Sequence, residues 1–320
     1  MLYLGLETSC DETACALVED GRKLISARLV SQTEIHKAFG GVVPEVAARR
    51  HLEVINRLVA EVLEEAQVSP SQLSGIACTN GPGLIGTLLV GLSCAKALAW
   101  ALDKPLISVD HINAHVCANF IDSTLEPPFV ALVVSGGHTQ IMHFADYRQA
   151  SILGQTLDDA SGEAYDKVAR LLGLGYPGGP AIDKLAQSGN PRAYNLPEAS
   201  VPGFDFSFSG LKTAVLRLVE NLSEPIPRAD LAASFQDAVN RALFRKTILA
   251  AKDLGVRKIV LAGGVAANSD LRHKFESQTD FAVFRPPLSL CTDNAAMVAS
   301  AAFFSGQPVA LSVGAYSRGH

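Results

Sequence analysis

The sequence predicts an α/β protein made of two similar lobes, because the same order of strands occurs twice. Three strand-like segments open the chain, and the pattern starts again near its middle. The first set covers 3–7, 13–19 and 23–30, and the second covers 129–135, 140–144 and 152–156. Both sets place a small polar loop between their first two strands, at 8–13 and at 135–139. The matched loops favour a duplication, and we expect a ligand cleft between the two lobes.

Helical patterns follow each set of strands. Residues 43–66 repeat apolar side chains at about 3.6-residue spacing, with Pro44 in the first turn. Further helices are expected at 84–102, 162–172, 180–187, 234–254 and 292–304, and further strands at 75–79, 105–109 and 258–262. We place the lobe boundary after residue 127. This gives lobes 1–127 and 128–320, with the last helix able to pack back on the N-terminal lobe.

Composition narrows the class of protein. The 320 residues are 48% hydrophobic and 18% charged, as in a compact globular enzyme. A net charge of −5 gives no global electrostatic attraction to nucleic acid, and Arg49-Arg50 and the 241–246 stretch are interpreted as solvated helix faces. Six cysteines without a C-x-x-C pattern indicate reduced thiols. No signal-peptide pattern precedes the first strand, and Lys96 interrupts the apolar 84–102 stretch, so we expect a cytoplasmic protein without a membrane segment.

The most informative motif is a histidine pair at His111 and His115. Four residues apart, the two imidazoles share one helix face and can bind a single metal ion. The zinc-protease pattern needs Glu after the first His, and here that residue is Ile112. Asp293, at a predicted helix start, is either a cap or a third ligand. Two histidines and a carboxylate suit Fe(II) or Zn.

Three glycine turns lie at strand ends or helix starts. In Ser135-Gly136-Gly137-His138-Thr139, two glycines would let backbone N–H groups approach an anion, although a plain hairpin is the alternative. The 263–268 turn opens a helix, where phosphate is favoured, and Asn268 either caps that helix or binds a ligand. The 176–180 turn precedes Asp183, which binds ribose hydroxyls or is an ordinary surface acid. The P-loop and G-x-G-x-x-G patterns are both missing.

Acidic residues form the second candidate group. Asp11 and Glu12 lie in the first polar loop, and Glu163 and Asp166 share one helix face. Complementing a helix dipole is the simpler explanation for the acids around residue 162.

Ten segments together resemble one family, the bacterial tRNA N6-adenosine threonylcarbamoyltransferases, formerly called the glycoprotease family and related to actin-like ATPases and sugar kinases. They occur in family order over almost the whole chain. They are ETSCDET (7–13), GGVVPE (40–45), GPG (81–83), the histidine pair, SGGHT (135–139), DDASGEAYDK (158–167), YPGGP (176–180), FDFSFSGLKT (204–213), GGVAAN (263–268) and CTDNAAM (291–297). The C-terminal segment 311–320 departs from the short basic tail that is common in this family.

The resemblance implies two actin-like (RNase H-like) lobes with a nucleotide and metal cleft. It also implies transfer of the threonylcarbamoyl group from threonylcarbamoyl-AMP to N6 of adenosine 37, 3′ of the anticodon, in tRNAs reading ANN codons. His111, His115 and Asp293 would hold the metal, with Fe(2+) favoured and Zn(2+) as the alternative. The adenylate would contact Val134, Ser135, Gly136, Gly137, His138, Asp166, Gly179, Asp183 and Asn268.

The resemblance further implies partners: tRNA, a smaller actin-like paralogue and a P-loop ATPase. Asp11 and Glu12 are our candidates for acid/base support, because they lie in the loop expected to face the cleft. ATP itself is a second nucleotide ligand to consider.

Three alternatives stay open at this point. An actin-like ATPase or small-molecule kinase would use the same lobes and glycine loops, but it needs no protein-held transition metal. A metalloprotease is disfavoured by Ile112. A non-catalytic scaffold subunit would tolerate loss of Asp11 and His111.

Overall fold

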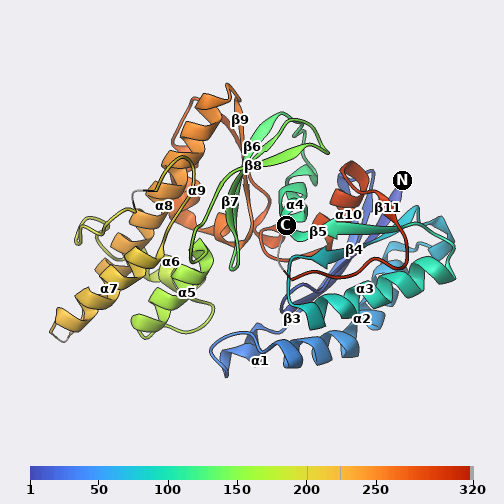
Figure 1. The fold of residues 1–320 in the computed structure, drawn as a ribbon. Helices are drawn as coiled ribbons and strands as arrows, with labels where there is room; N and C mark the ends of the chain where they lie inside the picture. Colours follow the sequence, from blue (N-terminus) through green and yellow to red (C-terminus); the bar gives the residue numbers. More distant parts are fainter. Residues whose placement is uncertain (200, 224, 318–320) are drawn as a thin grey trace. The chain divides into compact units, whose positions relative to one another are not determined.

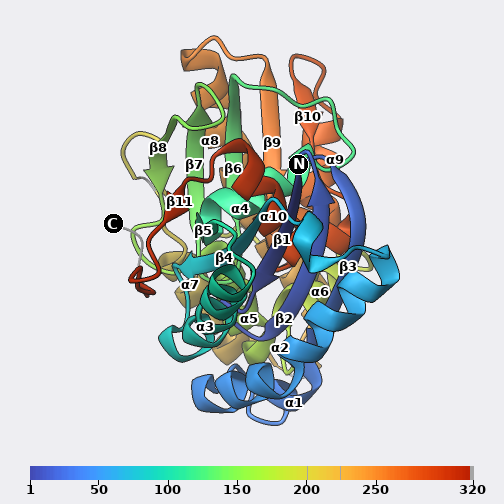
Figure 2. The same ribbon diagram turned by 90° about the vertical axis from the view of Figure 1, so that its right-hand side faces the viewer.

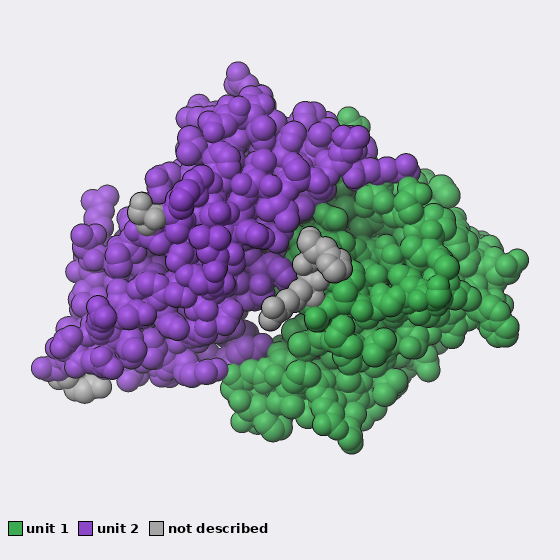
Figure 3. Space-filling view, viewed as in Figure 1, with its two compact units in different colours: residues 1–126, 286–320 green, residues 127–285 purple. Residues whose placement is uncertain are grey.

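The computed structural model describes residues 1–199, 201–223 and 225–317, which fold into two compact units (Figure 3). Unit 1 contains residues 1–126 and 286–320, and unit 2 contains 127–285. The expected boundary after residue 127 therefore lies one residue from the observed one. The segment from 286 onward, which that boundary assigned to the second lobe, belongs to unit 1 because its helix packs on the first sheet.

The two units share one strand order, which confirms the predicted duplication. In unit 1 the order is β3-β2-β1-β4-β5, and in unit 2 it is β8-β7-β6-β9-β10. In each sheet the first three strands are antiparallel and the last two continue parallel to the first. β11 (Pro308–Val309) adds an antiparallel edge to β5. The strands are β1 (Leu2–Glu7), β2 (Glu12–Glu19), β3 (Lys23–Ser31), β4 (Gly75–Gly81), β5 (Leu106–Asp110), β6 (Phe129–Val134), β7 (Thr139–Phe144), β8 (Ala150–Gln155), β9 (Lys258–Ala262) and β10 (Ala282–Phe284).

Most helices lie where the sequence predicts them, with differences at some ends. Figures 1 and 2 label them along the ribbon. Unit 1 has α1 (Thr33–Lys37), α2 (Pro44–Ala66), α3 (Ile85–Ala101), α4 (His111–Cys117) and α10 (Ala295–Phe304). Unit 2 has α5 (Ser161–Leu171), α6 (Gly178–Ala186), α7 (Ser209–Asn221), α8 (Arg228–Asp253) and α9 (Ser269–Glu276). α8 begins before the predicted residue 234. α10 begins after the predicted residue 292 because Asn294 caps it. α1 and α7 have no counterpart among the predicted elements.

Unit 1 buries both faces of its sheet. Side chains alternate along β1, so Leu4 and Leu6 join the apolar core formed with α2 and α3. Tyr3, Gly5 and Glu7 point to the opposite face, which α10 covers. An added Cβ at Gly5 would lie 2.4 Å from the carbonyl oxygen of Ala295, so the helix backbone approaches β1 as closely as the chain allows. This contact places the residues just before α10 at the carboxyl end of β1.

The core of unit 2 is separate and lies between its sheet and helices. Val130, Leu132 and Val134 of β6 pack with α5, α6 and α8, and all three side chains are fully buried. The β6–β7 loop and the β9 end therefore rest on a rigid apolar base.

Two further sequence expectations concern the surface. Within the described part of the chain, no helix combines the length and apolarity needed to span a bilayer. Arg49 and Arg50 form ion pairs with Glu45 and Glu53, as Arg241 does with Asp237. These arginines are thus paired helix-surface residues, as interpreted. For Lys246 the interpretation is wrong, because its side chain is buried and its Nζ donates to the carbonyl oxygens of Val201 and Asp205.

Substituting Gly5 tests the α10–β1 contact. We expect Gly5→Ala to lower the melting temperature by roughly 3–8 °C, since overpacking costs about 1–3 kcal/mol in a domain of this size. Differential scanning calorimetry measures the shift. Gly175→Ala is the matched control, because nothing lies within 4 Å of its added Cβ. An unchanged melting temperature in Gly5→Ala would contradict the close contact.

Candidate functional site

The three predicted metal ligands are positioned by two helix starts in unit 1. Asp110 ends β5, and its carboxylate accepts a hydrogen bond from the N–H of Asn113 at 2.9 Å, which caps α4. His111 is therefore the first residue of α4, and His115 follows one turn later. Asp293 lies before α10. Of the two roles expected for Asp293, the cap is taken by Asn294, which accepts from Met297 N–H at 3.0 Å.

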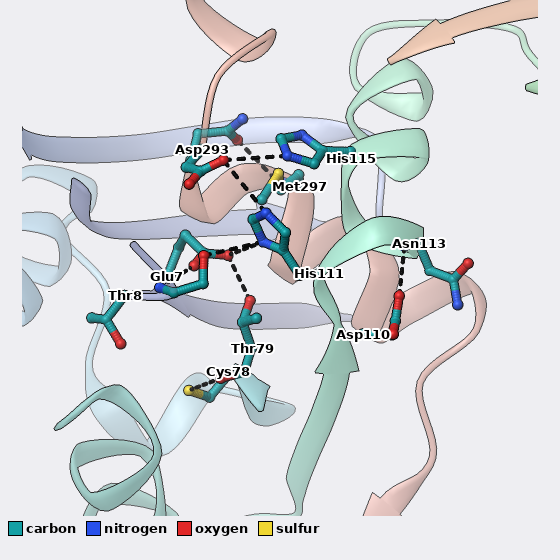
Figure 4. Close-up of polar contacts among 12 residues, drawn as sticks. Glu7, Thr8, Cys78, Thr79, Asp110, His111, Asn113, His115, Asp293 and Met297 are labelled. Atoms are coloured by element: carbon teal, nitrogen blue, oxygen red, sulfur yellow. Dashed lines mark hydrogen bonds and ion pairs between the residues drawn. The ribbon is translucent and has the colours of Figure 1, made fainter. Parts of the chain in front are cut away.

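The structure brings the three side chains together, as Figure 4 shows. One ligand atom from each of His111, His115 and Asp293 lies within 4.8 Å of the others. Asp293 Oδ1 is 3.2 Å from Nε2 of His115 and 3.6 Å from Nε2 of His111. Both imidazoles are buried, and Asp293 is about one-fifth exposed, with 19% of its side chain accessible. Two buried imidazoles and one partly exposed carboxylate grouped in this way could hold a metal ion.

His115 gives a direct test of whether these residues suit a cation. Its side chain is 1% exposed. In the described residues Nδ1 has no hydrogen-bond partner, and Nε2 lies 3.2 Å from the Asp293 carboxylate. Buried polar nitrogens are seldom left unpaired, because each costs about 1–3 kcal/mol. A cation bound to Nε2 would satisfy one of them. Two imidazoles and one carboxylate are also a donor set that binds Zn²⁺ or Fe²⁺.

A buried carboxylate contacts His111 at Nδ1, the ring nitrogen that does not face Asp293. Glu7 is fully buried at the end of β1, and its Oε2 lies 3.3 Å from Nδ1 of His111. Ser9 N–H donates to Oε1 at 2.6 Å and Thr79 Oγ1 donates to Oε2 at 2.6 Å. Burial opposes the charged form of both partners. Nevertheless, Asp293 and Glu7 raise the pKa of His111 to about 9, and His111 lowers the pKa of Glu7.

The first polar loop is anchored by His51 of α2. Its Nε2 lies 3.0 Å from the Cys10 carbonyl oxygen and its Nδ1 lies 2.7 Å from Thr13 Oγ1. Burial lowers the pKa of His51, so the ring is neutral and donates one hydrogen bond while accepting another. Asp11 and Glu12 are thereby held next to the metal ligands. Burial, Asp293 and Asp11 raise the pKa of Glu12 to about 9, so Glu12 carries a proton at neutral pH.

Glu7 and His51 were not among the predicted site residues. The signal for Glu7 was present, since a carboxylate ends an otherwise apolar strand that is buried on both faces. His51 sits in the regular periodicity of α2 and gave no such signal.

The predicted anion loop of unit 2 is a tight turn after β6. Ser135 N–H donates to the His138 carbonyl oxygen at 2.8 Å, and His138 N–H donates to Ser135 Oγ at 3.2 Å. Added Cβ atoms at Gly136 and Gly137 would meet nothing within 4 Å. Both glycines are exposed, although the backbone of Gly136 packs against Gly162 on one side. Val134 is fully buried, so only its backbone could take part.

The other predicted unit 2 residues lie around this loop. Gly162, at the start of α5, donates to the Ser135 carbonyl oxygen at 3.2 Å. One turn later, Asp166 accepts from Gly178 N–H at 2.7 Å, beside Gly179, and burial raises its pKa. Asp183, on α6, accepts from Ser269 N–H at 3.1 Å.

Asn268, the last of the predicted unit 2 residues, has a structural role. Its Oδ1 accepts from Leu271 N–H at 3.0 Å, which caps α9, and from Asn240 Nδ2 at 2.8 Å. Its Nδ2 donates to Gln236 Oε1 at 2.8 Å and to Asp183 Oδ1 at 3.2 Å. Of the two roles expected for Asn268, the cap is observed. α9 begins only after the 3-10 turn Gly264–Ala267, so the glycines themselves do not open the α-helix.

Comparison with known proteins identifies the family. A family model described as tRNA N6-adenosine threonylcarbamoyltransferase matches residues 23–300. The chain belongs to the tRNA N6-adenosine threonylcarbamoyltransferase family. The protein of that name from Symbiobacterium thermophilum is 54% identical over 311 residues, which cover 95% of this chain and 91% of the relative. That from Nostoc punctiforme is 52% identical over 332 residues, which cover 98% and 95%.

Solved structures agree on the fold. HypF from T. kodakarensis aligns with a TM-score of 0.66 at 18% identity over 94% of this chain and 47% of that one. The ROK hexokinase of Thermus thermophilus aligns with a TM-score of 0.52 at 15% identity over 95% and 98%. Both units of the chain therefore have the actin-like fold, as expected.

Family membership sets the reaction. The chain is a transferase that places a threonylcarbamoyl group on N6 of adenosine in tRNA. The alternatives of a kinase, a protease and a non-catalytic scaffold are thereby set aside.

The C-terminal segment of this threonylcarbamoyltransferase packs on unit 1. Tyr316 O–H donates to Asp110 Oδ2 at 2.7 Å, and Tyr316 N–H donates to the Asn80 carbonyl oxygen at 2.9 Å. Since Asp110 caps α4, the hydrogen bond from Tyr316 stabilises the start of the helix that carries the histidine pair. The last three residues of the segment expected to depart from the family pattern lie outside the described residues.

Replacing Asn268 tests its role as a cap. We expect Asn268→Ala to reduce the free energy of unfolding by about 1–3 kcal/mol, because a helix cap and buried hydrogen-bond partners are lost together. Chemical denaturation measures this. Asn268→Ser keeps a capping oxygen, so its free energy of unfolding should fall by less than that of Asn268→Ala. Equal stability of wild type and Asn268→Ala would show that the network does not stabilise unit 2.

Proposed function

We propose that His111, His115 and Asp293 hold one divalent cation, Fe²⁺ favoured and Zn²⁺ possible in its place, that takes part in threonylcarbamoyl transfer. The observation that carries the proposal is the grouping of two buried imidazoles with one carboxylate, since one ligand atom from each of His111, His115 and Asp293 lies within 4.8 Å of the others. When bound, such a cation polarises a carbonyl oxygen and favours attack on its carbon. The one-sided exposure of Asp293 supplies the route for that oxygen.

The donor in this proposal is threonylcarbamoyl-AMP. The exposed glycine turn at Gly136 and Gly137 supports binding of its phosphate, because backbone N–H groups in such turns suit an anion. Val134, Ser135, His138, Asp166, Gly179, Asp183 and Asn268 complete the proposed adenylate site. Asp183 and Asn268 already share hydrogen bonds with protein groups, so they would act mainly by shaping that site.

The bond changes follow from acyl transfer. The N6 amine of adenosine 37, in tRNAs reading ANN codons, attacks the carbamoyl carbon, a C–N bond forms, and the C–O bond to phosphate breaks with release of AMP. The amine must lose a proton. Glu12 already carries a proton at neutral pH, so we assign it hydrogen-bond donation and assign proton acceptance to Asp11.

We propose that the protein works in the cytoplasm with tRNA and two further proteins, a smaller actin-like paralogue and a P-loop ATPase. The net charge of −5 supports shared tRNA binding, since this chain offers little general attraction to phosphate. ATP is a second proposed adenine-nucleotide ligand.

Reconstitution tests the proposed donor. The chain, its two partners and tRNA are incubated with purified threonylcarbamoyl-AMP, and the digested nucleosides are analysed by mass spectrometry. Threonylcarbamoyl-adenosine at position 37, without added ATP in a single turnover, would support the proposal. Its formation from threonine and bicarbonate alone, independent of the adenylate, would contradict it.

Removing one ligand tests the cation site. We expect His115→Ala to lose at least nine-tenths of bound metal after anaerobic purification and to lose transfer activity, because two ligands hold the ion too weakly. Elemental analysis by mass spectrometry gives the stoichiometry. His273→Ala is the control, since that ring lies on the exposed surface of α9. Full metal content in His115→Ala would refute the assignment.

Metal affinity should also depend on pH. A cation bound to Nε2 of His111 displaces the proton that Asp293 and Glu7 favour on a ring with a pKa of about 9. Metal affinity should therefore rise with pH, by about tenfold per pH unit below 9 for one displaced proton, and level off above it. Chelator competition with Zn²⁺ between pH 6 and 8 measures the slope. A flat profile would contradict the proton competition.

A further inference from the structure

Both oxygens of the buried Glu7 carboxylate have polar partners. Each oxygen is already engaged: Oε1 accepts from Ser9 N–H at 2.6 Å, and Oε2 accepts from Thr79 Oγ1 at 2.6 Å. Oε2 also faces Nδ1 of His111 at 3.3 Å. With 0% exposure, Glu7 has no access to solvent. A carboxylate that is buried this completely and lies behind a proposed ligand needs an explanation.

The donors and acceptors fix which nitrogen of His111 carries its proton. An ionised carboxylate only accepts hydrogen bonds, so the ring nitrogen facing Oε2 must be N–H. Nε2 faces the Asp293 carboxylate at 3.6 Å, so it is the Nε2 proton that a cation would displace, while the proton on Nδ1 stays in the contact with Glu7. Ser9 Oγ, 3.2 Å from Nδ1, can accept or donate and therefore does not decide between the two tautomers.

We infer that Glu7 is a positioning residue, which locks His111 as the Nδ1–H tautomer and so prepares Nε2 to bind the cation. The inference rests on the cation site proposed above. Metal-bound histidines commonly donate their second N–H to a carboxylate, and losing that partner typically weakens metal binding about 10–100-fold. Thr79 and Ser9 in turn hold the carboxylate in place, so β1, β4 and α4 all contribute to the lock.

The substitution Glu7→Gln tests the inference, because glutamine has nearly the same shape as glutamate but offers a donor in place of the acceptor that faces Nδ1 of His111. The backbone N–H of Ser9 only donates, so the amide oxygen must remain at the Oε1 position. The amide N–H group then takes the Oε2 position and donates toward Nδ1 of His111. This favours the tautomer with its proton on Nε2, the nitrogen needed for the cation.

The test measures Zn²⁺ dissociation constants of the full-length protein by chelator competition. We expect Glu7→Gln to bind Zn²⁺ about 10–100-fold more weakly than wild type. Ser9→Ala, which keeps the backbone donor to Glu7, should shift the constant less than about threefold. Long-range ¹H–¹⁵N NMR of the Zn²⁺-loaded protein should show the His111 proton on Nδ1 in wild type.

Glu7→Asp separates hydrogen bonding from charge. Aspartate keeps the negative charge but is one methylene too short to reach His111. We expect it to bind Zn²⁺ as weakly as Glu7→Gln does. Wild-type affinity in Glu7→Asp would show that charge alone matters and would overturn the inference. Melting temperatures of the metal-free variants identify any that fail to fold.

The outcomes also distinguish this inference from the cation site itself. If wild type binds no Zn²⁺, or His115→Ala binds it normally, the proposed site is wrong. If wild type binds Zn²⁺ and Glu7→Gln binds it equally well, the site stands and the role of Glu7 is refuted. A Ser9→Ala defect as large as that of Glu7→Gln would assign the lock to Ser9 instead.

Discussion

The close packing of α10 on β1 is the constraint on which the site in unit 1 depends. A helix can approach a strand this nearly only where the strand has no side chain, and Gly5 supplies that position. Two residues further along β1, Glu7 points to the same face, and Asp293 lies before the start of the helix that covers it. The contact between Gly5 and α10 therefore fixes the positions of both Asp293, the proposed ligand, and Glu7, the carboxylate next to His111.

Electrostatics give the same region its chemistry. Four carboxyl groups gather around two imidazoles, and burial makes their mutual repulsion costly. The protein responds by holding Glu12 protonated and by raising the pKa of His111. A divalent cation would relieve this strain more fully than protons do, because it offsets two charges at one point. The arrangement thus favours cation binding before any substrate arrives.

The fold could largely be predicted from the sequence, because strand periodicity and buried helices leave strong local signals. The duplicated strand order and the ends of β9 are examples. What could not be predicted depends on contacts distant in sequence. We allowed for the last helix to pack on the N-terminal lobe, but not for the whole segment from 286 onward, which packs through the Gly5 contact. The roles of Glu7 and His51 depend on partners from other elements. For Asn268 the sequence left two roles open, a helix cap or a ligand contact, and its hydrogen bonds in the structure are those of a cap.

Anomalous X-ray diffraction from crystals soaked with Zn²⁺, recorded at the zinc edge, tests the central claim most directly. The account predicts a single strong peak about 2.0–2.2 Å from Nε2 of His111, Nε2 of His115 and Oδ1 of Asp293. Glu7 should remain outside bonding distance of the peak, in contact with Nδ1. A peak on other residues, or none at this cluster at full soaking occupancy, would contradict the account.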